Sequence, residues 1–376
     1  MSTIVIRRAS KETRRRPDKA ALAVYVLFLV LLAIASYGVP FITKAFYAIP
    51  LFTIGIWALA GGGLHRHSRL VVPFVFLLVL CLFSLYPYDF NTLKKTYFIL
   101  VYSSVFFFID FSRVPIDFRW LLAFFVLLEA PRIFLTGPDV LGGISVTESR
   151  SALESTFAFP IGLLSIYFLT QRRIIWFLVG ALFALIFLKR IVLLAIIIAV
   201  VLCLLPRFIR RWIVNPIVVT FGSILVVWFS IDFGFGTYDE FVKEITGKAA
   251  NDFSKGRAAL WGAALNGVEY HTAEFLPWGV GVGKVITILQ EHFNVRRILL
   301  HNDLLSLVLE AGWFSFVIFV LLLNWVKGEA QRLMAAFMTM LLATDNVLIY
   351  QHVMFVYLMI QQDLEARRLG KIGGSG

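Results

Sequence analysis

Residues 174–206 read IIWFLVGALFALIFLKRIVLLAIIIAVVLCLLP, two apolar runs separated only by Lys189 and Arg190. Similar runs recur along the chain, for example at 20–36, 70–85 and 313–323. A hydrocarbon layer ~30 Å thick is crossed by ~20 residues of helix, and by somewhat fewer where flanking groups reach the interface. The runs do not alternate with period two, as barrel strands would. The sequence therefore predicts an all-α polytopic membrane protein.

Composition agrees with this fold class. The 376 residues are 60% hydrophobic, with a mean hydropathy of +0.84, whereas soluble domains are usually ~45–50% apolar. Cys81 and Cys203 lie inside apolar runs and are interpreted as small buried hydrophobic residues. The net charge of +12 would suggest nucleic acid in a soluble protein. In a membrane protein, the positions of the Lys and Arg residues relative to the spans indicate the topology instead. We therefore expect no nucleic-acid partner.

The hydropathy pattern predicts about twelve transmembrane helices. Most of the 35 Lys and Arg residues lie on one side of the predicted spans, in the two terminal segments and in alternate loops, and the positive-inside rule assigns that side to the cytoplasm. Both termini are then cytoplasmic, and one long loop is periplasmic. The expected spans are 20–38, 45–61, 70–86, 95–110, 118–136, 154–170, 174–188, 191–206, 213–231, 299–323, 332–344 and 347–362.

Five regions follow from this topology. They are a basic cytoplasmic N-terminus (1–19), helices one to nine (20–231), the periplasmic loop (232–298), helices ten to twelve (299–362) and a cytoplasmic tail (363–376). No small-residue cleavage site follows the first apolar run, so we expect no cleavable signal peptide. The final Gly-Gly-Ser-Gly is interpreted as a remnant of an added linker.

The periplasmic loop has internal order. Apolar residues within Asp252–His271 recur at helical spacing, which predicts a helix on the external mouth of the bundle. Pro277–Gly283 then ends it. The alternating glycines of that stretch do not match a dinucleotide-binding pattern, and a tightly packed turn accounts for them. The chain has neither a P-loop nor a metal-binding motif, so we expect no metal and no cofactor.

Lys189 and Arg190 fall on the predicted external side. Snorkelling to the headgroups is one explanation of the pair, and binding of an anion such as a lipid pyrophosphate is the other. Arg150 and Arg257 lie on the same side, and each taken alone is explained as a solvated loop charge.

His301 begins the run His301–Gly312 at the predicted start of span ten. A neutral imidazole there can accept a proton from a hydroxyl, while a purely structural role is the alternative. Asn302 and Asp303 have the residue types of helix caps. Glu310, about two turns deeper, needs either a partner or a proton if it is buried.

Taken together, these segments resemble the superfamily of O-antigen ligases and Wzy polymerases, bacterial envelope glycosyltransferases. The resemblance covers roughly residues 145–320 and rests on Gly256-Arg257, Trp261, Pro277, the series Gly279/Gly281/Gly283, His301-Asn302, Leu305, Leu309, Glu310 and Gly312. It implies an active site facing the periplasm of the bacterial inner membrane. There, a glycan moves without a metal from undecaprenyl pyrophosphate to an acceptor hydroxyl.

The resemblance also implies residue roles. Arg190 and Arg257 would hold the pyrophosphate, and His301 would act as general base or orient the acceptor. Lys189, Arg150, Asn302 and Glu310 are carried as substrate-binding candidates. The segment before His301 lacks the polar lead-in common in the ligases, and Asp303 and Lys189 favour the exopolysaccharide polymerases.

The leading hypothesis is therefore a polymerase of lipid-linked repeat units. Its partners would be the lipid-linked donor, a glycan or lipid acceptor, the bilayer and a chain-length regulator. A ligase that transfers glycan to lipid A–core is the nearest alternative. Two further alternatives are a transporter or flippase, and a structural scaffold in an export complex. The sequence does not identify the sugars.

Overall fold

The computed structural model describes residues 18–36, 49–59, 66–84, 89–136, 155–187, 189–270, 278–296 and 298–370. These ranges contain α-helices and short 3₁₀ turns and no strand. The first half comprises α1 (Lys19–Ser36), α3 (Ile49–Leu59), η2 (Arg66–Val71), α4 (Val72–Phe83), α5 (Phe90–Phe108), η3 (Phe111–Arg113), α6 (Phe118–Thr136), α8 (Ala158–Thr170) and α9 (Ile174–Ile186). The all-α prediction is confirmed.

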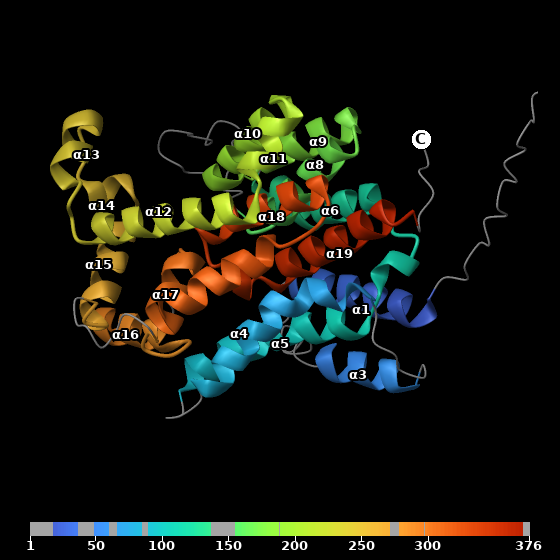
Figure 1. Ribbon diagram of the computed structural model, residues 1–376, viewed down its shortest axis with the longest axis horizontal. Helices are drawn as coiled ribbons and strands as arrows, with labels where there is room; N and C mark the ends of the chain where they lie inside the picture. Colours follow the sequence, from blue (N-terminus) through green and yellow to red (C-terminus); the bar gives the residue numbers. More distant parts are fainter. Residues whose placement is uncertain are drawn as a thin grey trace, which may run out of the picture.

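The second half is also helical and ends near Arg368 (Figure 1). It comprises α10 (Arg190–Leu204), α11 (Arg207–Ile213), α12 (Pro216–Gly234), α13 (Asp239–Thr246), α14 (Ala250–Phe253), α15 (Arg257–Gly267), α16 (Lys284–Phe293), α17 (Asp303–Asn324), α18 (Glu329–Leu342), η4 (Val347–Ile349) and α19 (Gln351–Arg368).

Every predicted span overlaps an α-helix, but the helices differ in length and hydropathy. Within the described ranges, α1, α12 and α17 are long and apolar enough to cross a membrane. Shorter apolar helices occupy Arg69–Phe83, Ala158–Thr170, Ile174–Ile186 and Arg190–Leu204. Membrane localisation is thus plausible, and the number of spans stays a prediction.

Large apolar side chains form exposed stripes on several outer helices. On α9 the stripe contains Ile175, Leu178, Leu182 and Leu185, and on α10 it contains Leu194, Ile197, Val201 and Leu204. On α12 it contains Ile217, Phe221, Leu225 and Trp228. The spacing of three or four residues places each set on one face of its helix. Such continuous apolar surface is rare on soluble monomers and suits contact with lipid.

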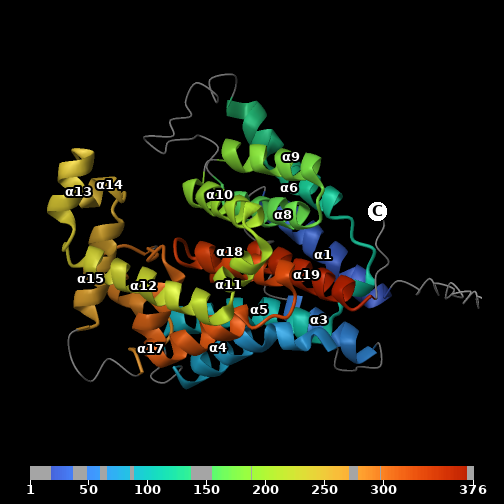
Figure 2. The ribbon, with the colours of Figure 1, turned by 45° about the horizontal axis from the view of Figure 1, so that its top comes forward.

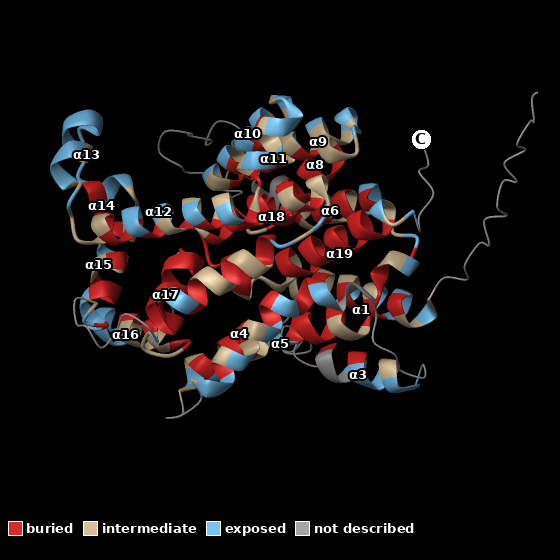
Figure 3. Ribbon diagram, in the orientation of Figure 1, coloured by how far each residue is buried: buried red, intermediate tan, exposed pale blue. Residues whose placement is uncertain are grey.

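The core lies between these outer helices, and Figure 3 shows it as buried segments of α8, α17, α18 and α19. All residues of α8 from Ala158 to Phe168 are buried. The rings of Phe28 on α1 and Phe355 on α19 stack with centroids 3.7 Å apart. In Figure 2, α8, α9 and α10 lie together on one side of α18 and α19, with α4 and α5 on the other. The C-terminal helices therefore form the centre of the bundle.

The segment between α12 and α17 gathers at one end of the bundle (Figure 1). The helix predicted across Asp252–His271 is interrupted at residues 254–256, so that its main part is α15. That helix packs closely on the end of α12, because a Cβ added at Gly262 would lie 2.6 Å from the carbonyl oxygen of Gly234. Trp261 Nε1 donates to the carbonyl oxygen of Leu300 at 2.9 Å. These contacts fix α15 beside His301.

The long helix α17 is broken at Gly312, whose φ of 78° and ψ of 166° are not helical. The break leaves the carbonyls of Leu309 and Glu310 without their helical donors, and buried carbonyls need others. The backbone N–H groups of Val280 and Gly281 supply them, at 3.0 and 2.8 Å. The glycine series is therefore a tightly packed turn against α17.

We predict that Gly279→Ala destabilises the protein through this turn. Gly279 has a φ of +67°, and an added Cβ would lie 2.5 Å from the carbonyl carbon of Glu310. The left-handed conformation alone costs an alanine ~1–2 kcal/mol. Thermal unfolding in detergent should show a melting temperature several degrees lower. Gly222→Ala, where nothing lies within 4 Å of the added Cβ, is the matched control; equal melting temperatures for both variants would contradict the packing described.

Candidate functional site

The predicted span 299–323 placed His301 in the first turn of a helix. In the structure, His301 lies just before α17, which begins at Asp303. The cap is responsible: Asn302 adopts an extended backbone conformation, and its Oδ1 accepts a hydrogen bond from the N–H of Leu305 at 2.9 Å. Asn302 is fully buried and also donates to Ser230 Oγ at 3.1 Å. Its observed contacts are structural, as the capping interpretation predicts.

The backbone of His301 is left-handed, with a φ of +55°. Non-glycine residues seldom adopt this conformation, and where they do, the surrounding structure holds them there. The side chain is 39% exposed while its neighbour Asn302 is buried. The strain therefore turns the imidazole out of the bundle at the end where α15 packs.

Asp345, between α18 and η4, holds one side of the imidazole. His301 Nδ1 lies 3.1 Å from Asp345 Oδ1. The same oxygen accepts hydrogen bonds from the backbone N–H of Asn346 at 2.8 Å and from the Tyr350 hydroxyl at 3.3 Å. Asp345 is 1% exposed, so these donors replace the water that an exposed carboxylate would have.

Lys189 completes this carboxylate site. Its Nζ lies 3.8 Å from Asp345 Oδ2 and 6.0 Å from the centre of the Phe159 ring. Arg190, the next residue, is exposed at the start of α10. The structure thus brings Lys189, one member of the predicted cation pair, to His301 through a shared carboxylate.

The charge state of Asp345 decides which tautomer of His301 the site stabilises. Burial by itself would raise the pKa of Asp345, but the hydrogen bond from His301 and the charge of Lys189 outweigh it and lower the pKa below its ordinary value. An ionised carboxylate only accepts, so His301 Nδ1 carries the hydrogen. Nε2, across the ring from Asp345, is then the nitrogen able to take up a proton.

Arg257 approaches the same cluster from α15. It is the half-buried first residue of that helix. Trp261, one turn later on α15, donates a hydrogen bond to the carbonyl oxygen of Leu300, the residue before His301. The helix that begins with Arg257 is therefore anchored beside His301.

His301 also lines a cavity of about 480 Å³. We call it the His301 pocket. Its polar lining residues are Asn91, Lys94, Lys95, Gln290, Arg296 and His301. The remaining lining residues are apolar and come from α5, α15, α16, the segment before His301, and η4. No aspartate or glutamate is among them.

Glu310, predicted to bind substrate, lies behind the wall of this pocket. Its side chain is 0% exposed, and its Oε2 accepts a hydrogen bond from Lys95 Nζ at 2.5 Å. Lys95 also donates to Ser306 Oγ at 3.1 Å. Lys95, and not Glu310, lines the pocket. The partner that a buried carboxylate requires is therefore Lys95.

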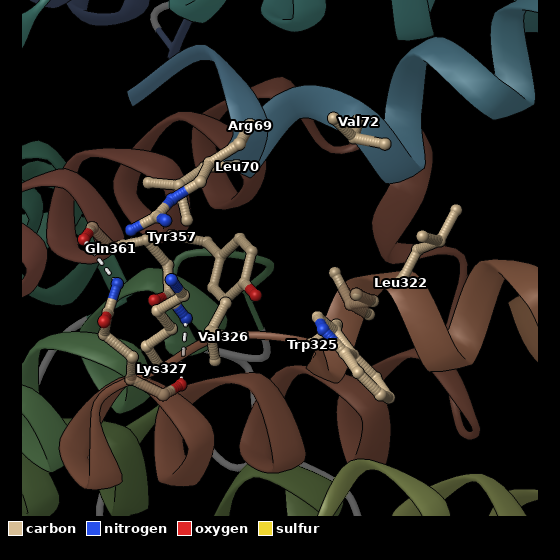
Figure 4. A pocket seen from close by; sticks show the side chains of 11 residues that line it. Arg69, Leu70, Val72, Leu322, Trp325, Val326, Lys327, Tyr357 and Gln361 are labelled. Atoms are coloured by element: carbon tan, nitrogen blue, oxygen red, sulfur yellow. Dashed lines mark hydrogen bonds between the residues drawn. The ribbon is translucent and has the colours of Figure 1, made fainter. Parts of the chain in front are cut away.

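Other predicted features lie elsewhere. Arg150 and Pro277 are outside the described residues. Within the described ranges no group of three His, Cys, Asp or Glu side chains is placed to hold a metal ion. A second cavity, of about 210 Å³, lies near Trp325 at the opposite end of α17 (Figure 4). Its wall includes Gln331 and Gln361, whose side-chain amides each donate to the other's backbone carbonyl.

Sequence reasoning missed Asp345, Tyr350 and the Lys94-Lys95 pair. Asp345 stands in a short polar segment, Thr344-Asp345-Asn346, between two predicted spans that point to the external side. Lys94 and Lys95 begin a predicted span on that same side. Polar groups on one predicted face were the available signal, but their pairing depends on tertiary contacts.

Comparison with known proteins adds no relative: no family model, no curated protein and no solved structure matches the chain.

We predict that Asp345→Asn lowers stability in a pH-dependent way. The substitution keeps the shape but removes a charge that accepts hydrogen bonds, each worth ~1.5–3 kcal/mol. Because the folded pKa is lowered, the stabilisation is complete above ~3.9, the pKa of an unfolded aspartate, and is lost as the pH falls through the folded pKa.

Thermal unfolding of both proteins between pH 3 and pH 7 measures this effect. The difference in melting temperature should be largest above about pH 5 and shrink towards pH 3. Exposed Asp252→Asn serves as the control and should leave the melting temperature unchanged. If the difference in melting temperature between wild type and Asp345→Asn does not change with pH, Asp345 is not held ionised.

Proposed function

We propose that this chain is a glycosyltransferase of the bacterial inner membrane with twelve spans and a site facing the periplasm. The exposed apolar stripes on α9, α10 and α12 support contact with lipid. The helix α17, with its break at Gly312, is long and apolar enough to cross a membrane.

The charges at the far end of α17 fit the cytoplasmic assignment. Glu329 pairs there with Arg207, Arg210 and Arg211. Arg69 likewise pairs with the buried Glu365. These cations belong to segments that the positive-inside rule assigns to the cytoplasm, and His301, Asp345 and Arg257 lie at the other end.

The observation that carries the proposed activity is the position of His301. A strained histidine, oriented by a buried carboxylate that Lys189 also approaches, lines a pocket. A carboxylate that fixes the imidazole tautomer is the arrangement of a general base. Lys189 supplies positive charge beside Asp345, and we assign Arg190 and Arg257 to the same anionic leaving group, which such cations would stabilise.

The proposed reaction moves a glycan between two oxygens. His301 Nε2 takes the proton of an acceptor hydroxyl as that oxygen attacks the anomeric carbon of the donor sugar. The bond from this carbon to the pyrophosphate oxygen breaks, and undecaprenyl pyrophosphate leaves with the electron pair. Arg190 and Arg257 hold the pyrophosphate and stabilise the charge that it gains. A second lipid-linked repeat unit is the acceptor, so repeated transfer builds a polysaccharide.

Purified protein supplied with undecaprenyl-pyrophosphate repeat units tests this activity. Wild type should produce longer chains without added lipid A, and His301→Ala should reduce the rate by ~10²–10⁴-fold, the usual contribution of a general base. Arg257→Gln should cost ~10²–10³-fold. The exposed Lys243 on α13 offers the control Lys243→Gln, with wild-type activity.

The same assay separates the alternatives. If glycan transfer occurs only after lipid A–core is added, the activity is that of a ligase and not of a polymerase. Cells carrying His301→Ala that accumulate lipid-linked repeats on the cytoplasmic side would favour a transporter. Full polymer length with Arg257→Gln would favour a scaffold and contradict the proposal.

Cysteine labelling tests the topology. In a Cys203→Ser background, with the other native thiol, Cys81, fully buried, a cysteine replacing exposed Lys248 should react with an impermeant maleimide in intact spheroplasts. A cysteine replacing exposed Arg172 should react only after the membrane is opened. The reverse pattern would place the site in the cytoplasm.

A further inference from the structure

The described residues that line the His301 pocket carry a net positive charge. The cations among them are Lys94, Lys95 and Arg296, and no aspartate or glutamate is among them. Its volume of about 480 Å³ falls in the ~300–1,000 Å³ range of ligand sites. The pocket is thus large enough for a ligand and biased towards an anion.

The neighbouring carboxylates are already engaged. Glu310 pairs with Lys95 behind the wall, which neutralises that one lysine. Asp89, at the start of α5, pairs with Lys284 at 3.4 Å and accepts a hydrogen bond from Thr287 at 2.7 Å. The exposed Lys94 and Arg296 therefore provide most of the pocket's positive potential.

Both of these cations are held by the local structure. The ammonium of Lys94 lies 5.9 Å from the centre of the Phe98 ring. Gln290 Nε2 donates to the backbone carbonyl of Arg296 at 2.8 Å, and Asn91 Nδ2 donates to Gln290 Oε1 at 3.0 Å. This chain of hydrogen bonds ties the segment bearing Arg296 to α16 and α5. The backbone that carries Arg296 is therefore held in place, which reduces part of the ordering cost of binding.

The remaining walls suit a sugar ring. Phe98, Leu299 and Ile349 line the pocket and offer apolar surface to the C–H faces of a saccharide, while cations bind its charged substituents. The three cations assigned to the donor pyrophosphate, Lys189, Arg190 and Arg257, are absent from the lining. His301 belongs to both groups, with Asp345 on one side and the pocket on the other.

We infer that the His301 pocket is the acceptor site and that it selects a glycan bearing a carboxylate, a uronic-acid type of sugar. Lys94 and Arg296 bind the carboxylate and place a neighbouring hydroxyl at His301 Nε2. This assignment rests on the proposed glycosyl transfer, which it refines by naming the class of acceptor.

Binding of defined oligosaccharides to the purified full-length chain tests the inference. The probes are a glucuronic acid trisaccharide and its carboxyl-reduced, neutral counterpart, titrated calorimetrically. The acidic probe should bind at least about tenfold more tightly than the neutral one, a difference expected for one or two charge-assisted contacts. Lys94→Gln and Arg296→Gln should each reduce that preference by about tenfold, and Lys243→Gln should preserve it. Equal binding of both probes by wild type would overturn the inference.

Two further measurements separate this inference from the proposed reaction. His301→Ala should still bind the acidic trisaccharide, so binding without any glycan transfer by wild type would reject the reaction and leave an anionic saccharide site. Inorganic pyrophosphate should lose affinity in Arg257→Gln and keep it in Lys94→Gln. Loss of pyrophosphate binding in Lys94→Gln alone would make the pocket the donor site and overturn the acceptor assignment.

Discussion

The ionised carboxylate of Asp345 is the constraint on which the site depends. It is 1% exposed, and a charge at such depth is tolerated only with nearby donors and cations. His301, Asn346 and Tyr350 meet one of its oxygens, and Lys189 approaches the other. These partners come from α10, the start of α17 and the segment between α18 and α19. A single buried charge thus joins three parts of the chain and fixes the orientation of the imidazole.

A second constraint acts on the helix that follows His301. The break at Gly312 frees two carbonyls of α17, and the turn after Gly279 satisfies them. The turn that precedes α16 is thereby fastened to the bundle by backbone hydrogen bonds, while Trp261 fastens α15 to the carbonyl of Leu300. Interrupted helices in membrane proteins commonly stand where irregular backbone borders a site. Here the interruption anchors the turn that leads into α16, the helix that contributes Ile286 and Gln290 to the His301 pocket.

Much of this arrangement follows from the sequence. The length of the apolar runs predicts the helices, and short-loop charge predicts that Lys189, Arg190, Arg257 and His301 share one face; the helices are present, and Lys189 and His301 meet at Asp345. The pairings were beyond prediction, because Lys95 and Glu310 are separated by 215 positions and His301 and Asp345 by 44. A buried carboxylate in the sequence indicates that a partner is needed, but it does not indicate which residue that partner is. The start of α17 was also misplaced, since hydropathy does not detect that Asn302 caps the helix after a strained histidine.

We assign two separate cationic regions to the donor and to the acceptor, and an experimental structure with a lipid-linked repeat unit bound tests this assignment most directly. We predict the pyrophosphate between Arg190 and Arg257, with the anomeric carbon facing His301 Nε2 and the His301 pocket left for the acceptor. A pyrophosphate between Lys94 and Arg296, or in the cavity near Trp325, would contradict that division of the site.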